Sequence, residues 1–224
     1  MKIKIHNLSK VFRNGTTALA NVNFDIEDGL CVLVGSNASG KTTLLRILAT
    51  LLKPTSGTIQ YDGIDLQNNR GAVRSITGYL PQKFGEFPRM TALEFLDYSA
   101  RLAGLHHKKE RDAEIEELFE LLGLHALRNT RANELSIVMK RHLEIAQAVI
   151  GNPRVLLVDE PTQGLSLEER LRFDNLLASR IEKIEITIMT THILSDLSST
   201  CNALGVLERG EITYHGRPDG YLAR

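Results

Sequence analysis

Short, uninterrupted apolar runs alternate along this chain with stretches whose apolar residues recur at helical spacing. The runs at 30–34 and 155–158 have the length of buried strands. Residues 42–52 have a helical pattern, which the Pro-Thr-Ser-Gly segment at 54–57 ends. Strands that alternate with helices in this way predict an α/β protein with a mainly parallel sheet.

The two ends of the chain are predicted to be rich in strands. The residues before the first run indicate short antiparallel strands with a turn at Asn14-Gly15. Residues 58–62 and 186–190 have the pattern of further strands, a helix is expected from about residue 167, and a hairpin is expected at the C-terminus.

The middle of the chain has a different pattern. From about residue 91 to residue 150, apolar residues recur at helical spacing between charged ones, and Asn152-Pro153 ends this segment. We therefore expect one domain over 1–224, with a core at 1–86 and 152–224 and an inserted helical subdomain at about 87–151.

Composition narrows the class of protein. The 27 basic and 27 acidic residues cancel, which argues against a general nucleic-acid binder. Cys31 and Cys201 lack the spacing of metal ligands and are expected to be free thiols in a reducing compartment. We find neither a signal peptide nor an apolar run long enough to cross a membrane, so we expect contact with a membrane only through a partner.

Residues 35–42 carry the clearest chemical motif. They are Gly-Ser-Asn-Ala-Ser-Gly-Lys-Thr, which fits the phosphate-binding pattern G-x-x-x-x-G-K-[ST]. A buried strand enters this loop and a helix leaves it, so backbone N–H groups at the helix start are expected to face phosphate. Lys41 is expected to reach the β- and γ-phosphates, and the Thr42 hydroxyl is expected to bind Mg²⁺. The expected nucleotide contacts are Gly35, Ser36, Asn37, Ala38, Ser39, Gly40, Lys41, Thr42 and Thr43.

Two carboxylates follow the second buried run. Asp159 and Glu160 stand at its carboxyl end, where ligands lie in open α/β sheets. Asp159 is expected to hold Mg²⁺ through water, and Glu160 is expected to orient or deprotonate an attacking water.

The ordered set of motifs resembles the nucleotide-binding subunit of an ABC (ATP-binding cassette) transporter. The set comprises the glycine loop, Gln82, Leu135-Ser136, Asp-Glu-Pro-Thr at 159–162 and His192. This resemblance, nearest to small cassettes of bacterial exporters, covers essentially the whole chain. It implies a P-loop NTPase core, ATP and Mg²⁺ as ligands, a separate transmembrane permease, and a peripheral place at the cytoplasmic face of the membrane. It also implies a second ABC subunit that faces this one head to tail.

The resemblance assigns four further roles. Phe12 matches the aromatic residue that stacks on adenine, with core packing as the alternative. Gln82 matches the residue that reaches Mg²⁺ and water at the boundary of the helical insert, and His192 matches the histidine that contacts the γ-phosphate. Residues 84–88 resemble part of the groove that receives a helix of the membrane subunit.

The segment expected to serve the nucleotide of the other subunit departs from the family. It comprises Ser136, Ile137, Val138 and Met139, where the family usually has Ser-Gly-Gly-Gln. Glycine adopts backbone conformations that β-branched residues resist, so positive φ at these two positions would cost roughly 1–3 kcal/mol each. Ser166 likewise stands where the family usually has Asp.

These departures favour a heterodimer of unequal sites, because the residues that serve the chain's own nucleotide are intact. A homodimer with slow turnover is the alternative. For function, an energy-coupling ATPase is favoured by Glu160 and His192, whereas a regulatory module with little hydrolysis is favoured by Ile137 and Val138. A soluble ABC protein of translation or DNA repair usually carries tandem cassettes or long coiled coils, which this chain lacks.

Overall fold

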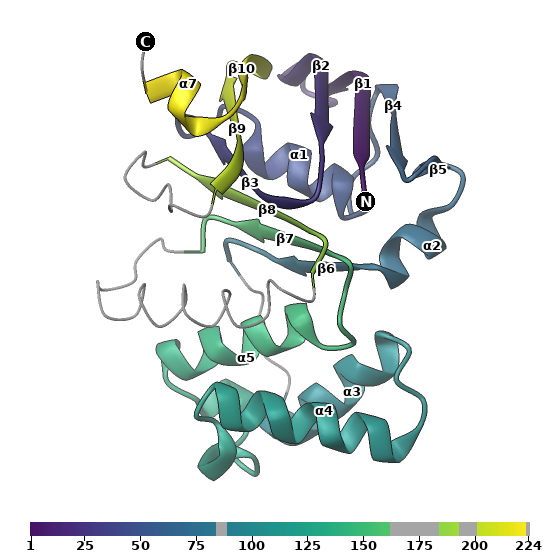
Figure 1. Cartoon of the computed structure of the whole chain (residues 1–224). Coiled ribbons are helices and arrows are strands. Elements are labelled where there is room, and N and C mark those ends of the chain that lie inside the picture. The colour runs from purple at the N-terminus through teal and green to yellow at the C-terminus, as the bar shows by residue number, and fades with distance from the viewer. Residues whose placement is uncertain (84–88, 162–183, 193–200, 223–224) are drawn as a thin grey trace.

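The computed structural model describes residues 1–83, 89–161, 184–192 and 201–222 (Figure 1). Two sheets and a group of helices form its layers. The first sheet is antiparallel, with strand order β2-β1-β4-β5. Its strands are β1 (Ile3–Val11), β2 (Thr17–Ile26), β4 (Ser56–Tyr61) and β5 (Ile64–Asp65).

The second sheet has the order β10-β9-β3-β8-β7-β6. All of its neighbouring strands are parallel except β9 and β10, which form the C-terminal hairpin. The strands are β3 (Gly29–Val34), β6 (Thr77–Leu80), β7 (Val155–Asp159), β8 (Ile186–Thr191), β9 (Cys201–Glu208) and β10 (Glu211–Gly216).

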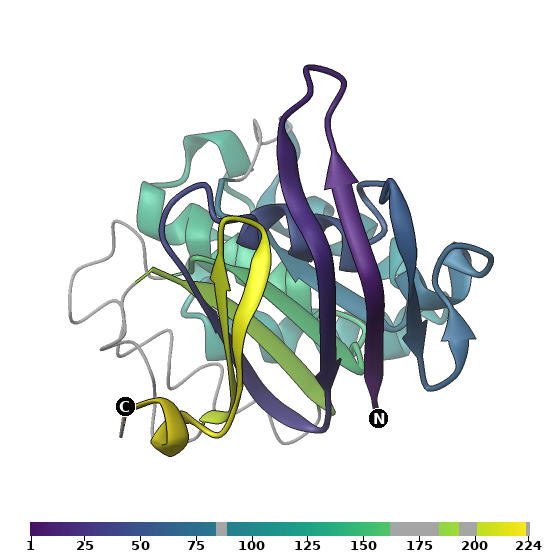
Figure 2. The same cartoon turned by 90° about the horizontal axis from the view of Figure 1, so that it is seen from above.

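Helix α1 (Lys41–Leu48) packs between the two sheets, which Figure 2 shows from above. Its buried face, which includes Leu44 and Leu48, joins one hydrophobic core with residues of both sheets. The helix ends earlier than the expected 42–52. Thr50 has a positive φ of 61°, and the amides of Leu51 and Leu52 turn back to the Arg46 carbonyl. This tight turn stops the helix although the apolar pattern continues.

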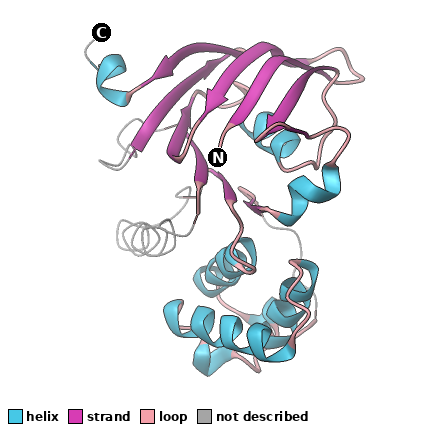
Figure 3. Cartoon of the chain, turned by 45° about the vertical axis from the view of Figure 1, so that its right-hand side comes forward, coloured by secondary structure: helices cyan, strands magenta, loops and turns pink. Residues whose placement is uncertain are grey.

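The helical region, residues 91–150, lies at the opposite end of the molecule from the antiparallel sheet (Figure 3). Its helices share a second hydrophobic core with one face of the parallel sheet. They are α3 (Ala92–Leu102), α4 (Lys108–Leu121), two short 3₁₀ turns (His125–Leu127 and Ala132–Glu134) and α5 (Ile137–Val149). Thr91 and Glu94 form a capping box that starts α3.

The expected fold class is confirmed: a mixed α/β chain with an N-terminal antiparallel portion, a mainly parallel sheet and inserted helices. The short helices α2 (Arg70–Ser75) and α7 (Pro218–Leu222) were not expected. The helix expected from about residue 167 lies outside the described residues. The exact limits of a helical subdomain at 87–151 stay a prediction.

Candidate nucleotide site

The order of the parallel sheet brings the predicted site residues to one edge. Strands β3, β8, β7 and β6 are consecutive neighbours and run in the same direction. Their carboxyl ends therefore lie side by side. The glycine loop follows β3, His192 follows β8, Asp159 and Glu160 stand at the end of β7, and Gln82 follows β6.

The glycine loop at 35–40 is shaped by close backbone packing. A Cβ on Gly35 would lie 2.3 Å from the carbonyl oxygen of Leu207 in β9. Gly40 has a φ of +111°, and a Cβ there would lie 2.5 Å from the Ala18 carbonyl oxygen. Both positions therefore require glycine, which lets the loop wrap tightly into the start of α1.

Lys41, the first residue of α1, points back into this loop. Its ammonium donates hydrogen bonds to the carbonyls of Gly35 and Ser36, at 2.7 and 3.0 Å. The same ammonium lies 3.2 Å from Glu160 Oε1, and both side chains are buried. A buried cation thus sits at the N-terminal end of a helix, where the backbone already favours anions.

Glu160 is the point on which the site residues converge. Gln82 donates its amide N–H to Glu160 Oε2 at 3.3 Å, and His192 Nδ1 lies 3.3 Å from the same oxygen. The backbone N–H of Glu160 donates to the Thr190 hydroxyl at 2.9 Å, and Glu160 has a positive φ of 43°. The four residues predicted to act on ATP, counting Lys41, therefore form one cluster.

Asp159 is fully buried beside this cluster. Its Oδ1 accepts hydrogen bonds from the hydroxyls of Thr42, at 3.1 Å, and Thr190, at 2.7 Å. Its Oδ2 is buried and has no hydrogen-bond partner. Burial raises the pKa of Asp159 above its ordinary value, while the two threonine hydroxyls oppose that rise. An unpartnered buried carboxylate oxygen next to a threonine hydroxyl is a suitable donor for a hard cation such as Mg²⁺.

Phe12 lies just after β1, in the turn that leads into β2. Its side chain is 39% exposed, which excludes the alternative that it is a core residue. The Lys10 ammonium lies 5.4 Å from the centre of its ring. An exposed aromatic face is thus available for stacking.

The segment at 135–139 begins α5. Ser136 is the N-cap, and its hydroxyl accepts the Met139 N–H at 3.3 Å. Ile137 and Val138 are the first two residues of the helix, and neither has a positive φ. The positive φ on which the expected backbone cost depended is therefore absent at both positions. The remaining difference from glycine is the size of the side chains. That of Ile137 is 86% exposed and so projects from the helix start. Ser166 and residues 84–88 lie outside the described residues.

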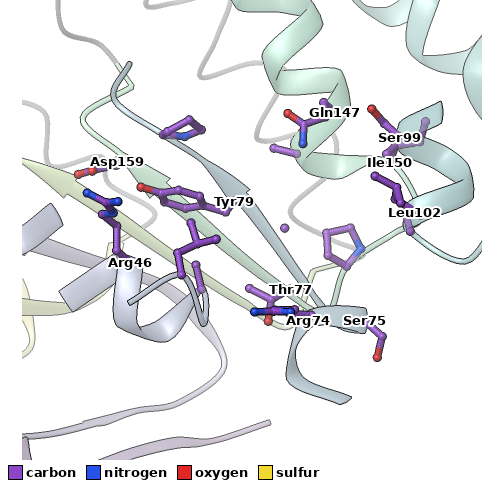
Figure 4. A pocket seen from close by; sticks show the side chains of 18 of the residues that line it. Arg46, Arg74, Ser75, Thr77, Tyr79, Ser99, Leu102, Gln147, Ile150 and Asp159 are labelled. Atoms are coloured by element: carbon purple, nitrogen blue, oxygen red, sulfur yellow. The ribbon is translucent and has the colours of Figure 1, made fainter. Parts of the chain in front are cut away.

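A groove of about 860 Å³ runs from this site to the helical region (Figure 4). One end of the groove has Thr42, Gln82 and Asp159, and the other has Leu102 of α3 and Gln147 of α5. Other lining residues include Arg46, Arg74, Tyr79 and Lys83. Burial, together with the nearby charge of Asp159, raises the pKa of Tyr79 to about 12, so Tyr79 lines the groove as a neutral phenol.

Sequence reasoning missed two residues that join these parts. Thr190 bonds both Asp159 and the Glu160 backbone, and its position at the end of β8 was a usable signal. Arg141 of α5 donates hydrogen bonds to the carbonyls of Pro81 and Pro161, and no motif marks it.

A glycine loop between a buried strand and a helix, with acidic residues on a neighbouring strand end, defines a P-loop nucleotide-binding protein. Comparisons with known proteins agree with this class. A family model described as "ABC transporter" matches residues 19–163. The chain belongs to the ABC transporter family, as an ATP-binding cassette, the nucleotide-binding domain of such transporters.

Two bacterial relatives are similar over most of the chain. The "Uncharacterized ABC transporter ATP-binding protein YxlF" of Bacillus subtilis (strain 168) is 36% identical over 215 residues, which are 96% of this chain and 70% of the relative. The "ABC transporter ATP-binding protein NatA" of the same organism is 34% identical over 201 residues, which are 89% of this chain and 81% of the relative.

A solved structure is also similar in fold. It is the "dimeric structure of a post-hydrolysis state of the ATP-binding cassette MJ0796 bound to ADP and Pi", with a TM-score of 0.85 and 26% identity. The match covers 96% of this chain and 98% of that one. Cassettes of this family bind ATP, dimerise and work with membrane permease subunits. In the described part of this chain, no helix has both the length and the apolar character that crossing a bilayer requires.

Proposed function

We propose that this chain hydrolyses MgATP at a dimer interface and so drives export through a separate membrane permease, from a peripheral place at the cytoplasmic face of the membrane. The observation that carries this proposal is the convergence of Lys41, Gln82 and His192 on the Glu160 carboxylate. Three such partners on one buried carboxylate, beside a phosphate-binding loop, support a reacting centre. The export direction follows from the resemblance to small cassettes of bacterial exporters.

The nucleotide is proposed to bind along the glycine loop. Its phosphates would accept hydrogen bonds from backbone N–H groups of 35–43, and Lys41 would exchange its carbonyl partners for phosphate oxygens. The adenine would stack on the exposed face of Phe12.

Mg²⁺ fits the donors that are present. Thr42, Gln82 and Asp159 would hold it, with phosphate oxygens and water as the remaining ligands. Among the described residues, no group of three or more His, Cys, Asp or Glu side chains is arranged so that it could hold a metal ion. When bound, the ion supplies positive charge that neutralises the phosphate oxygens.

The hydrolytic step needs a base for water. Glu160 would accept a proton as the water oxygen attacks the γ-phosphorus and the bond to the leaving ADP oxygen breaks. Gln82 and His192, each 3.3 Å from Glu160 Oε2, are placed to orient that water and the γ-phosphate. Lys41 would stabilise the charge that grows on the phosphate oxygens.

The second subunit is proposed to be a different chain. In the head-to-tail pair, the segment Ser136, Ile137, Val138 and Met139 would face the nucleotide of the partner. The exposed Ile137 side chain would occupy space that a phosphate needs, although the helix start itself is unstrained. A partner with glycines at these positions would complete the Glu160 site. A homodimer with slow turnover is the alternative.

A regulatory module that closes on ATP with little hydrolysis is the second candidate function. The bulk of Ile137 is the observation that favours it, because closure and turnover depend on that segment. The intact cluster around Glu160 favours hydrolysis instead.

The test compares three proteins over a range of concentrations: the wild type, Ile137→Gly/Val138→Gly and Ile137→Ala/Val138→Ala. Phosphate release is measured for each. The wild type is expected to be nearly inactive, and the glycine variant is expected to gain activity that rises steeply with concentration. Because bulk rather than strain is the obstacle, the alanine variant is expected to recover much of the same activity.

A wild type that hydrolyses ATP well, with little change in either variant, would contradict the unequal-site proposal. A Lys41→Ala variant is the control. It is expected to lose ATP binding, and with it any phosphate release that comes from this chain. If neither double variant turns over ATP, whereas all three proteins bind it, the regulatory function is favoured.

The groove beside the site is proposed to receive a short segment of the permease. Arg46 lines it and is exposed, and its guanidinium makes no hydrogen bond or ion pair with any described residue. Arg74 and Lys83 add positive charge, so an acidic side chain of the permease would fit. Arg46→Glu is expected to weaken co-purification with the permease from solubilised membranes, whereas Lys53→Glu, outside the groove, is the matched control.

A further inference from the structure

Helix α5 touches the parallel sheet at a close backbone contact near its C-terminal end. A Cβ on Gly78 of β6 would lie 1.9 Å from the Ala148 carbonyl oxygen, so the two backbones are in direct contact. Van der Waals packing of this kind fixes the spacing between two elements. A single contact point of this kind does not by itself fix the angle between them.

A second contact lies about two turns nearer the start of α5, on the same face. The Arg141 guanidinium donates to the Pro81 carbonyl at 3.1 Å and to the Pro161 carbonyl at 3.4 Å. These hydrogen bonds are directional, so they hold the angle of α5 that the first contact leaves open.

The two acceptors of Arg141 stand beside the reacting cluster. Pro81 immediately precedes Gln82, and Pro161 immediately follows Glu160. The helix that carries Arg141 also starts at the N-cap Ser136. One guanidinium therefore contacts the two chain segments that place Gln82 and Glu160, and it stands on the helix that presents Ser136.

Glu144 holds the guanidinium in this position. Its Oε2 accepts a hydrogen bond from Arg141 Nη1 at 2.6 Å, one turn along the helix, and both side chains are largely buried. Burial raises the pKa of Glu144, and the hydrogen bond from Arg141 opposes that rise. Each charge thus requires the other, because a buried ion without its partner is costly.

We infer that Arg141 is a positioning residue that ties the angle of α5, and with it Ser136, to the placement of Gln82 and Glu160. In a pair of cassettes, Ser136 would serve the nucleotide of the other subunit, whereas Gln82 and Glu160 would serve the chain's own. Arg141 would then carry the state of one site to the other within a single chain. This role in turnover rests on the proposed function; the mechanical tie does not.

The mechanical tie is tested without nucleotide. Spin labels at Glu120→Cys on α4 and Lys4→Cys on β1, in a Cys201→Ser background, report the distance between the helical region and the first sheet. Arg141→Gln is expected to broaden the distance distribution. Arg141→Lys, which keeps the charge but not the forked donor, is expected to restore it in part. Lys140→Gln removes a charge from the neighbouring position and is expected to leave the distribution unchanged.

Arg141→Gln leaves the Glu144 carboxylate buried without its partner and can unfold the protein for that reason alone. The double variant Arg141→Gln/Glu144→Gln removes both charges, and its thermal midpoint shows whether it is folded. It is expected to give the same broad distribution. Distributions of the single and double variants that superimpose on the wild type would overturn the inference.

The second measurement is the rate of ATP hydrolysis. It is made in the wild type if that hydrolyses ATP, and otherwise in the Ile137→Gly/Val138→Gly background. The Arg141 variants are expected to lower kcat by roughly ten- to hundredfold, because small misplacements of reacting groups have effects of that size. The KM for ATP is expected to stay within about twofold, because Arg141 touches no part of the phosphate loop. An unchanged kcat in a background that turns over would contradict the role in turnover. If neither background hydrolyses ATP, it is the proposed function that fails, and the distance measurement still decides the mechanical tie.

Discussion

The ammonium of Lys41 lies 3.2 Å from Oε1 of Glu160, and both groups are buried at the carboxyl edge of the parallel sheet. Lys41 also donates to two carbonyls of the glycine loop. The lysine that we propose binds phosphate and the carboxylate that we propose activates water are thus each other's partners. Phosphate that draws Lys41 away would leave the Glu160 carboxylate free to accept a proton.

Replacing Glu160 by Gln is expected to separate ATP binding from hydrolysis. The amide keeps the size of the side chain but cannot accept the proton of water, so kcat is expected to fall by at least about a hundredfold. ATP affinity is expected to hold or rise, because Lys41 loses a competing negative charge. Phosphate release and a fluorescent-ATP titration measure the two effects. Glu110→Gln, on an exposed face of α4, is the control, and a Glu160→Gln variant that keeps more than a tenth of wild-type turnover would contradict the role.

Asp159→Asn is expected to change stability and activity in opposite directions. The raised pKa of Asp159 means that the folded state binds this proton more tightly than the unfolded state, so stability falls as pH rises between the two pKa values. At neutral pH the buried carboxylate therefore costs stability. Asn keeps an oxygen for the hydroxyls of Thr42 and Thr190 and removes the charge.

The thermal midpoint of Asp159→Asn without nucleotide is expected to rise. In a domain of this size, each 1 kcal/mol of added stability moves the midpoint by about 2–4 °C. Mg²⁺-dependent hydrolysis is expected to fall by at least about tenfold. Differential scanning calorimetry and a Mg²⁺ titration of phosphate release provide the measurements. A lower midpoint together with intact hydrolysis would show that Asp159 is structural.

Phe12→Ala is expected to weaken ATP binding by about five- to hundredfold, the range that follows from the loss of one base-stacking aromatic. The thermal midpoint is expected to change little, because the side chain is 39% exposed. Phe12→Tyr keeps the ring and is expected to bind ATP as the wild type does. Val11→Ala, at an equally exposed neighbour, is the control. If the alanine and tyrosine variants bind ATP with equal affinity, the adenine does not stack on residue 12.

The acid side of the stability profile is expected to depend on Glu185. Hydrogen bonds from Arg154, together with the N-terminal ammonium, lower the pKa of Glu185 to about 2. A lowered pKa contributes stability that is complete above the unfolded value of 4.5 and is lost as pH falls toward 2. The carboxylate is exposed, so the contribution is expected to be no more than about 1 kcal/mol.

Urea unfolding of the wild type and Glu185→Gln from pH 7 to pH 3 measures this contribution. The wild type is expected to be the more stable protein at pH 7, and the gap is expected to narrow as pH falls below about 5 and to shrink further in 0.5 M salt. Glu110→Gln again serves as the control. If the difference in unfolding free energy between the two proteins does not change with pH, the ion pair is not its source.

Much of the site followed from local sequence. The glycine loop, Asp159 and Glu160 are marked by short motifs because their chemistry needs fixed residue types at fixed spacing. Parallel strands carry these motifs to a common edge whatever the surrounding sequence. For the same reason the fold class followed from the alternation of apolar runs and helical patterns, which reports burial directly.

Contacts between distant segments were not predictable in this way. The positive-φ turn at Thr50 ends α1 inside a continuing apolar pattern. A backbone cost at Ile137 and Val138 was expected only if these positions had positive φ. Ser136 caps a helix there, and both residues have ordinary helical geometry. Whether a backbone position needs glycine depends on its φ and on the atoms packed around it. Neither can be read from the identity of the residue alone.

The sequence by itself therefore determined which chemical groups this protein has: a phosphate loop, two carboxylates after a buried strand, and an altered segment at 136–139. Only the tertiary structure decided how they are joined. It placed Lys41, Gln82 and His192 on the one carboxylate of Glu160, and it set Arg141 against the carbonyls of Pro81 and Pro161. The physical reason is the sequence separation of the groups involved. A motif consists of residues that are close together in the chain, whereas these contacts depend on how separate strands and helices pack.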